Sequence, residues 1–280
     1  SSPIDLANSV TSLKRAYNFM LACERSAPEY PQITPEADDL VIDLGAYQGL
    51  FLHALRQNYQ VRVLPCDFSQ AGMDFARTLL GMKDARVIKD LYSENFDERA
   101  RFVTMVHFLE HLNDPMRVLR HVRQHLLSED GFLYIEVPNL HGHPLADPFH
   151  FFSYSFDSLQ RVLALAGFEI INIFSSSFPP KPQNVWANND QNLVCLARPT
   201  DKKSEFPPLD AAAIRADLRK AYARHSSRGV WRITKQALRD VVKAAYCFVF
   251  AVLMERLSPS LMMSMARALG FRRTPSIHKD

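Results

Sequence analysis

The sequence predicts an α/β fold with a seven-stranded, mostly parallel sheet and helices on both faces. Short apolar runs alternate along the chain with segments of helical periodicity, an order typical of strand–helix–strand units. The chain has 280 residues, of which 47% are hydrophobic, so it can bury one substantial core and an appendage. Charged residues make up 22%, which is ordinary globular composition and argues against disorder.

The predicted elements follow from apolar runs, turn residues and helix caps. Ser69 is a predicted helix N-cap, Pro138 stops a strand and Gly167 ends a helix. The expected strands are residues 40–44, 61–65, 86–88, 102–106, 132–137, 168–173 and 193–197. The expected helices are residues 8–25, 50–57, 69–80, 115–127 and 156–166.

A change of composition near residue 200 predicts two parts, a domain over residues 1–200 and a helical extension over residues 201–280. Residues 201–280 hold 16 Lys and Arg against 7 Asp and Glu, a net charge of +9, whereas residues 1–200 hold 17 against 23, a net charge of −6. Helices are expected over residues 209–224 and 230–257. A basic tail on an acidic body favours an anionic partner for the tail.

The cysteines and the N-terminus give information about the cellular compartment of the protein. The four cysteines are far apart and form no C-x-x-C pair, which argues against a zinc ribbon and a disulfide framework. The sequence SSPIDLANSV has no basic start and no long apolar run, so it does not resemble a signal peptide. Together these features predict a cytoplasmic protein.

The segment after the first predicted strand has the pattern of a nucleotide-type cofactor site. Asp43 ends the strand, and Gly45 and Gly49 allow a tight turn before the next helix. Asp67 follows the second strand, 22 residues after Gly45, where a carboxylate can bind a ribose. NAD is the competing cofactor, but its G-x-G-x-x-G pattern has a third glycine and no acid just before the first. Asp43 therefore favours a cofactor with an aminoacyl group.

Four blocks in order resemble the class I S-adenosylmethionine-dependent methyltransferases over residues 35–198. They are VIDLGAYQG, VRVLPCDFS, FVTMVHFLEHLNDPMRVLRHVRQHL with GFLYIEVPN, and HFFSYSFDSLQRVLALAGFEI. The resemblance implies a Rossmann-like fold and S-adenosyl-L-methionine as the cofactor. By the same resemblance, the methionine part is surrounded by Asp43, Gly45, Ala46, Tyr47 and Gly49. The family often has glycine where Tyr47 stands, so the loop is expected to depart from the family's geometry there.

The resemblance also assigns the other end of the cofactor. Asp67 is expected to bind the ribose and Phe68 to flank the adenine. Asp90 and Leu91 match the position that meets the adenine edge. His107 is expected to line the cofactor site just after the fourth strand.

The run His107-Phe-Leu-Glu110-His111 also fits H-x-x-E-H, a metalloprotease pattern. Such a site needs both histidines on one helix, but this run follows a buried strand and Pro115 comes four residues later. We therefore expect no metal ion here. His111 remains a candidate catalytic residue, because ligands bind at the carboxyl ends of the strands in open sheets.

A second histidine group follows the fifth strand. His141 and His143 are expected to be solvated loop residues. His150 precedes an aromatic run, and proteins of the resembling family often have histidine there, so it is the second candidate catalytic residue. An imidazole can accept the proton of a hydroxyl during methyl transfer.

The expected reaction is O-methylation of a small-molecule, sugar, glycan or lipid-linked saccharide acceptor. C- or N-methylation of a nucleotide sugar or another metabolite is the alternative, and a non-catalytic binding module is the third reading. For the tail, residues 209–273 are expected to contact an anionic membrane at its inner face. A helical cap or a homodimer surface is the competing interpretation, and no nucleic acid is expected.

Overall fold

The computed structural model describes residues 6–141, 149–176 and 191–202, and in the C-terminal part residues 206, 210, 212–216 and 218–219. Residues 212–216 and 218–219 are helical, inside the helix predicted over residues 209–224. The helix predicted over residues 230–257 lies outside the described residues, as do most of the expected extension and His143. No helix among the described residues is long and apolar enough to cross a membrane.

A seven-stranded sheet forms the centre of the described part, and each predicted strand is present. The strands are β1 (Leu40–Leu44), β2 (Arg62–Asp67), β3 (Arg86–Val87), β4 (Ala100–Val106), β5 (Leu127–Pro138), β6 (Phe168–Ser176) and β7 (Asn192–Pro199). Their spatial order is β3-β2-β1-β4-β5-β7-β6. Neighbours from β3 to β5 pair in parallel, whereas β7 runs antiparallel to both β5 and β6. The mostly parallel sheet is thereby confirmed.

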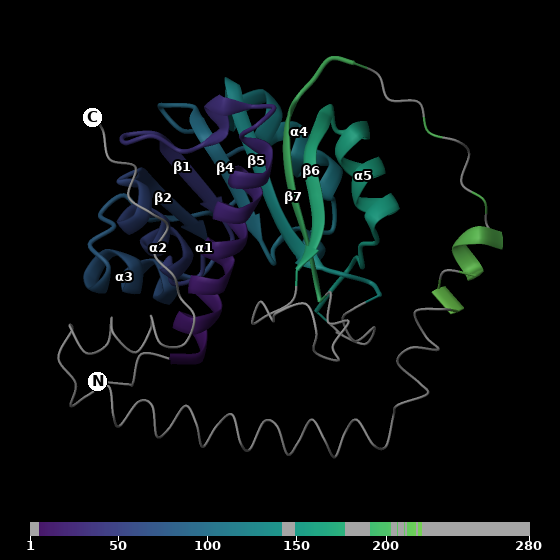
Figure 1. The fold of residues 1–280 in the computed structure, drawn as a ribbon. Helices are drawn as coiled ribbons and strands as arrows, with labels where there is room; N and C mark the ends of the chain where they lie inside the picture. Colours follow the sequence, from purple (N-terminus) through teal and green to yellow (C-terminus); the bar gives the residue numbers. More distant parts are fainter. Residues whose placement is uncertain are drawn as a thin grey trace, which may run out of the picture. The chain divides into compact units, whose positions relative to one another are not determined.

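Helices cover both faces of this sheet, as predicted (Figure 1). The helices that pack on the sheet are α1 (Leu6–Ser26), α2 (Leu50–Tyr59), α3 (Gln70–Leu79), α4 (Pro115–His121) and α5 (Phe156–Leu165). Buried side chains of α1, α2 and α3 share one core cluster with one face of the strands. Side chains of α4 and α5 share a second cluster with the opposite face. The order of helices and strands thus gives the Rossmann-like arrangement expected from the sequence.

The N-terminal helix α1 packs on the middle of the sheet, where Figure 1 shows it crossing the strands in purple. Phe19 is fully buried and makes edge-to-face ring contacts with Phe102 of β4 and Tyr134 of β5, at centroid distances of 5.5 and 5.1 Å. Burial of an aromatic side chain of this size contributes roughly 2–3 kcal/mol to folding. Because α1 covers the central strands, it belongs to the core of the sheet domain.

The helix predicted over residues 115–127 is present through Leu126, but its last part is π-helical. The α-helical part ends at His121, a π-helical turn covers Val122–Leu126, and β5 begins at Leu127. Leu126 and Leu127 are both buried, and Leu127 pairs with Ala100 of β4. The strand predicted over residues 132–137 therefore begins earlier than expected, because the polar residues 128–130 interrupt the apolar pattern and hide its start.

Candidate functional site

The predicted cofactor residues gather at the carboxyl edge of the sheet. Asp43 at the end of β1 pairs with Pro65 of β2 and with Thr104 of β4, so these three parallel strands end close together. The segments that follow them carry the glycine loop, Asp67 and His107. Parallel pairing therefore brings parts of the chain that are far apart in sequence to one edge, where open sheets bind ligands.

Glycine is required at two points of the loop after β1. Gly45 has a φ of +84°, and a Cβ atom there would lie 2.3 Å from Cδ2 of Phe108. Gly49 has a φ of +74° and forms the N-cap of α2. L-residues with a side chain rarely adopt these angles. The backbone thus makes a tight turn, and the missing side chain of Gly45 lets the Phe108 ring pack directly against it.

Tyr47 takes a left-handed backbone conformation that normally favours glycine, with a φ of +48°. A side chain thus stands here on a positive-φ position. The Tyr47 ring is 53% exposed, so it packs little against the protein. Its backbone N–H donates a hydrogen bond of 2.8 Å to Oδ2 of Asp67. Tyr47 therefore fixes the loop against the end of β2.

Asp67 is held by two backbone donors. Oδ2 accepts from Tyr47 N, and Oδ1 accepts from Ser69 N at 2.8 Å. Ser69 in turn caps α3, because its hydroxyl accepts a hydrogen bond from Gly72 N, as predicted. Each carboxylate oxygen can accept a further hydrogen bond, so Asp67 keeps acceptor capacity for the hydroxyls of a ribose.

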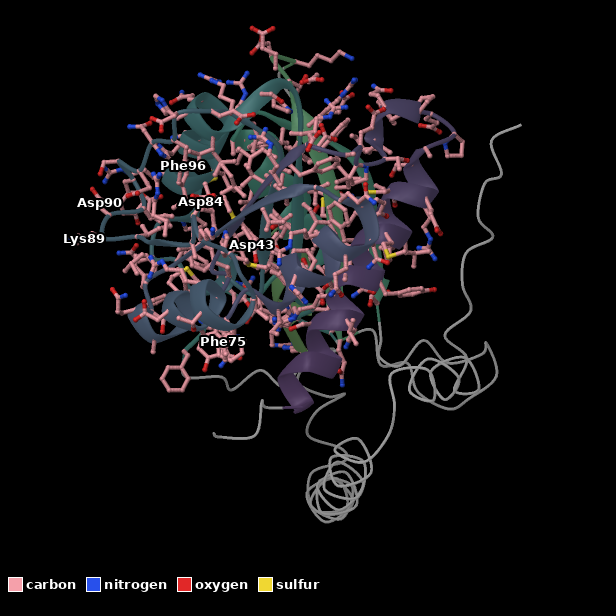
Figure 2. The ribbon with its side chains drawn as sticks, turned by 90° about the vertical axis from the view of Figure 1, so that its left-hand side faces the viewer. Asp43, Phe75, Asp84, Lys89, Asp90 and Phe96 are labelled. Atoms are coloured by element: carbon pink, nitrogen blue, oxygen red, sulfur yellow. The ribbon has the colours of Figure 1, made fainter. Side chains whose placement is uncertain are left out.

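Asp43 lies inside the sheet domain (Figure 2) and is 2% exposed. Its Oδ1 accepts a hydrogen bond of 2.7 Å from Thr104 Oγ1 on β4. Burial raises the pKa of Asp43 to about 7, and the nearby Asp67 adds to this rise, although the Thr104 bond and Arg15 oppose it. A cationic group at the loop would favour the charged form of Asp43.

Two phenylalanines stand beside the loop. Phe68 is half exposed, and its ring is stacked on that of Phe108 with a centroid distance of 6.4 Å. Phe108 also packs against Gly45, so it touches both the glycine turn and the residue after Asp67. Phe108 was missed in the sequence. The available signal was its place directly after His107 at the end of a buried strand.

Asp90 and Leu91 are placed differently from one another. Asp90 lies at the periphery in Figure 2, where its carboxylate accepts hydrogen bonds from Tyr92 N and the Ser93 hydroxyl. These bonds lower the pKa of Asp90. The Leu91 side chain is buried in a core cluster. Any contact from Leu91 to an adenine edge would therefore come from its backbone.

His107 stands between two buried carboxylates. Its Nδ1 lies 3.5 Å from Glu110 Oε1, and its Nε2 lies 3.6 Å from Glu136 Oε1. Its φ of +52° is a strained conformation of the kind that clusters at functional sites. Burial would raise the pKa of Glu136, but hydrogen bonding and the charge of His107, with Asn18 and Arg15, hold that pKa at about 2. Glu136 was also missed, because it sits in an apolar strand pattern.

The two candidate catalytic histidines, His111 and His150, lie close together. They come from distant parts of the chain, since Phe149, which directly precedes His150, is 38 residues from His111. The rings of His111 and His150 are 4.8 Å apart in an edge-to-face arrangement. Nδ1 of His111 is 2.8 Å from the carbonyl oxygen of Phe149. Because a carbonyl oxygen only accepts, Nδ1 carries the proton, and Nε2 is the acceptor in the neutral ring.

The H-x-x-E-H run does not form a long helix. Residues Leu109–His111 make a 3-10 turn, and His107 precedes it with its ring between Glu110 and Glu136. The prediction that His107 and His111 do not share a metal-bearing helix agrees with this geometry. His141 is half-buried, and its N–H donates to Asn139 Oδ1 at 3.1 Å.

Comparison with known proteins identifies the family. The family model described as a methyltransferase domain matches residues 14–173, which is more than half of the chain. No curated protein sequence matches the chain.

Solved structures share the fold at low sequence identity. A methyltransferase from Haloferax volcanii in complex with the Trm112 methyltransferase activator gives a TM-score of 0.54 at 17% identity, covering 69% of this chain and 94% of that one. Mitomycin 7-O-methyltransferase gives 0.50 at 15% identity, covering 68% and 54%. An S-adenosylmethionine-dependent methyltransferase from Clostridium acetobutylicum gives 0.49 at 12% identity, covering 70% and 98%.

The residues at the carboxyl edge fit the cofactor of this family. The positive-φ glycines make a tight turn beside Phe108, Asp67 has acceptor capacity, and Phe68 is half exposed. The chain therefore belongs to the methyltransferase domain family and is a class I methyltransferase that uses S-adenosyl-L-methionine.

Proposed function

We propose that this enzyme methylates a hydroxyl oxygen of a sugar, glycan or lipid-linked saccharide. The observation that carries the proposal is the segment 107–111. Phe108 packs against Gly45 of the cofactor loop, and the ring of His111, three residues later, lies against that of His150. Residues suited to the cofactor and residues suited to an acceptor thus adjoin one another along a single short turn.

For the cofactor, we propose the residues that the sequence predicted, with Phe108 added. Asp43, Gly45, Ala46, Tyr47 and Gly49 would surround the methionine part. Asp67 would bind the ribose, and Phe68 with Phe108 would flank the adenine. Asp90, Leu91 and His107 would complete the site. When bound, S-adenosylmethionine supplies a methyl group on a sulfonium, which is already a good leaving group.

For the acceptor, we propose His111 and His150 as the catalytic residues. Nε2 of His111 is oriented to accept the hydroxyl proton, because Nδ1 donates to Phe149. The side chains of Phe149 and Phe151, which flank His150, are 77% and 70% exposed. A sugar ring presents C–H faces that pack on aromatic rings, and exposed aromatic groups often mark binding sites. The chain's task is then to align the hydroxyl and take its proton.

The test combines cofactor binding with product analysis. Calorimetry should show S-adenosylhomocysteine binding to the wild type, a strong loss in Asp67→Ala, and no change in Asp74→Ala, an exposed acid of α3 paired with Arg77. His150→Ala should lose about 10²–10⁴-fold in turnover while keeping S-adenosylhomocysteine affinity. Absence of cofactor binding by the wild type would refute the proposed cofactor site.

The acceptor is tested with S-adenosylmethionine carrying a ¹³C-labelled methyl group. Sugar nucleotides and polyprenyl-linked saccharides are the acceptors to compare. A label found on oxygen supports the proposal. A label found on carbon or nitrogen replaces it with the C- or N-methylation alternative.

For the remainder of the chain, we propose that residues 1–200 are the methyltransferase domain and that residues 209–273 contact an anionic membrane surface. The support is the charge asymmetry of the sequence, with a net charge of +9 over residues 201–280. Basic residues that alternate with apolar ones suit the interface of an anionic bilayer. A homodimer through the same segment is the alternative.

A further inference from the structure

A carboxylate and two imidazoles meet beside the segment 107–111. Glu110, His111 and His150 each offer one ligand atom, and the three atoms lie within 4.8 Å of one another. It is the one such group of three or more found in the part of the chain that the structure describes. Two histidines and one carboxylate are a donor set that suits Zn²⁺, Mn²⁺ or Fe²⁺.

The backbone holds the three residues in place. Glu110 and His111 are neighbours in the 3-10 turn after β4. The carbonyl oxygen of Glu110 accepts hydrogen bonds from Phe151 N at 2.9 Å and Phe152 N at 3.2 Å. The residues directly after His150 are therefore tied to the turn that carries the other two. This contact explains why residues so distant in sequence form one cluster.

The hydrogen bond of His111 orients its ring for metal binding. Nδ1 donates to the Phe149 carbonyl, and Nε2 lies 3.9 Å from Glu110 Oε1. A histidine that binds a metal through one nitrogen commonly donates its other N–H to a carbonyl or carboxylate, which fixes the tautomer. Nε2 is thus the nitrogen with a lone pair, and it faces the carboxylate.

The three donor atoms, which lie within 4.8 Å of one another, have to move closer together to bind one ion. Donor atoms around a tetrahedral Zn²⁺ are about 3–3.5 Å apart, given Zn–N and Zn–O bonds near 2 Å. The side chain of His111 is 40% exposed, so it can rotate toward Glu110 without disturbing the core. The Glu110 side chain is 1% exposed, and at such low exposure its charge attracts a cation more strongly than in water.

The sequence argument against a metal concerned a different pair of histidines. It excluded His107 and His111 on one long helix, and in the structure His107 instead lies between Glu110 and Glu136. The second imidazole of the cluster comes from His150. The H-x-x-E-H pattern could not predict this partner, because it lies outside the motif.

We propose that Glu110, His111 and His150 bind one divalent transition-metal ion, such as Zn²⁺ or Mn²⁺. The role of the ion, which rests on the proposed function, would be to bind the acceptor oxygen as a Lewis acid and lower the pKa of the hydroxyl. Nε2 of His111 would then hold the ion instead of taking the proton, and the hydroxyl proton would leave to water. Binding of the ion itself does not depend on that function and can be measured without an acceptor.

The test uses the full chain after treatment with EDTA and dialysis. Calorimetric titration with ZnCl₂, and separately with MnCl₂, should give one site per chain. His150→Ala and Glu110→Gln should each weaken binding at least about 10-fold. The matched control is His125→Ala. His125 stacks on His121 at a centroid distance of 4.8 Å, but among the residues that the structure describes this pair belongs to no cluster of three possible metal ligands. That variant should bind the ion like the wild type.

Two results would overturn the proposal: no binding of either ion by the wild type, or equal binding by the wild type and His150→Ala. Circular dichroism checks the fold, and His150→Ala keeps the test decisive if Glu110→Gln does not fold. S-adenosylhomocysteine binding is measured in parallel with EDTA present. A protein that binds the cofactor and transfers methyl groups in EDTA retains the proposed function without the metal. A protein that binds the ion but no cofactor retains the metal site alone.

Discussion

Individual residues at the carboxyl edge of the sheet show what sequence patterns can predict about the site and what they cannot. Asp43 near the end of β1, the two glycines and Asp67 at the end of β2 could be predicted, because strand ends and glycine turns leave local signals. Phe108 could not, since its role depends on lying where a Cβ of Gly45 would be. Tyr47 could be predicted only in part. Its departure from glycine was visible in the sequence, but its φ of +48° required the structure.

Asp43 should make the stability of the apo protein depend on pH. Its folded-state pKa is raised to about 7 by burial, from 3.8. The folded chain therefore retains this proton over a range where the unfolded chain loses it. The stability from Asp43 is full below pH 3.8 and is lost as pH rises through about 7. Asn at this position lacks the titration but can still accept from Thr104.

Urea unfolding of the wild type and Asp43→Asn at pH 5 and pH 8 measures this effect. Relative to the wild type, Asp43→Asn should gain about 2–3 kcal/mol in unfolding free energy between these two pH values. Other titrating groups are common to both proteins and cancel in the difference. Parallel pH profiles would show that Asp43 is already ionised in the folded apo protein.

At the scale of elements, the sheet was predictable and the docking of α1 was not. Periodicity predicts a helix over residues 8–25, but nothing local indicates which strands it covers. In the structure, Asn18 of α1 donates from Nδ2 to Glu136 Oε2 on β5 at 3.0 Å, and the Ser176 hydroxyl of β6 donates to Asn18 Oδ1 at 2.9 Å. Asn192 of β7 donates to the other Glu136 oxygen at 2.6 Å. The buried carboxylate of Glu136 on β5 thus connects α1 with β5 and β7.

Asn18→Ala should destabilise the fold by about 2 kcal/mol, because it removes a donor from a fully buried carboxylate and a partner from Ser176. The control is Asn58→Ala on α2, whose Nδ2 bonds only to the Ala54 carbonyl of its own helix. Urea unfolding at neutral pH measures both variants. Similar losses in the two variants would mean that the Glu136 network adds nothing beyond an ordinary helix contact.

At the scale of the whole molecule, the sequence predicted the class of fold because alternating strands and helices leave few topologies. It also predicted that the proposed cofactor residues gather at one edge of the sheet, since parallel strands end together. Only part of the proposed acceptor site could be predicted from the sequence. His111 and His150 were each candidates, yet their meeting depends on how the backbone of residues 151 and 152 bonds to Glu110, which no periodicity encodes.

The charge asymmetry of the chain predicts that the protein binds an anionic membrane through its basic C-terminal part. The net charge of +9 over residues 201–280 attracts an anionic surface, while the net charge of −6 over residues 1–200 opposes it. Each basic residue near such a surface contributes about 1 kcal/mol.

The full chain should therefore sediment with phosphatidylserine vesicles and not with phosphatidylcholine vesicles. Raising the salt from about 0.1 to about 1 M should release it, because the Debye length falls from about 10 to about 3 Å. A chain ending at residue 200 is the control. Equal sedimentation of both chains, or with both lipids, would refute a membrane role for the tail.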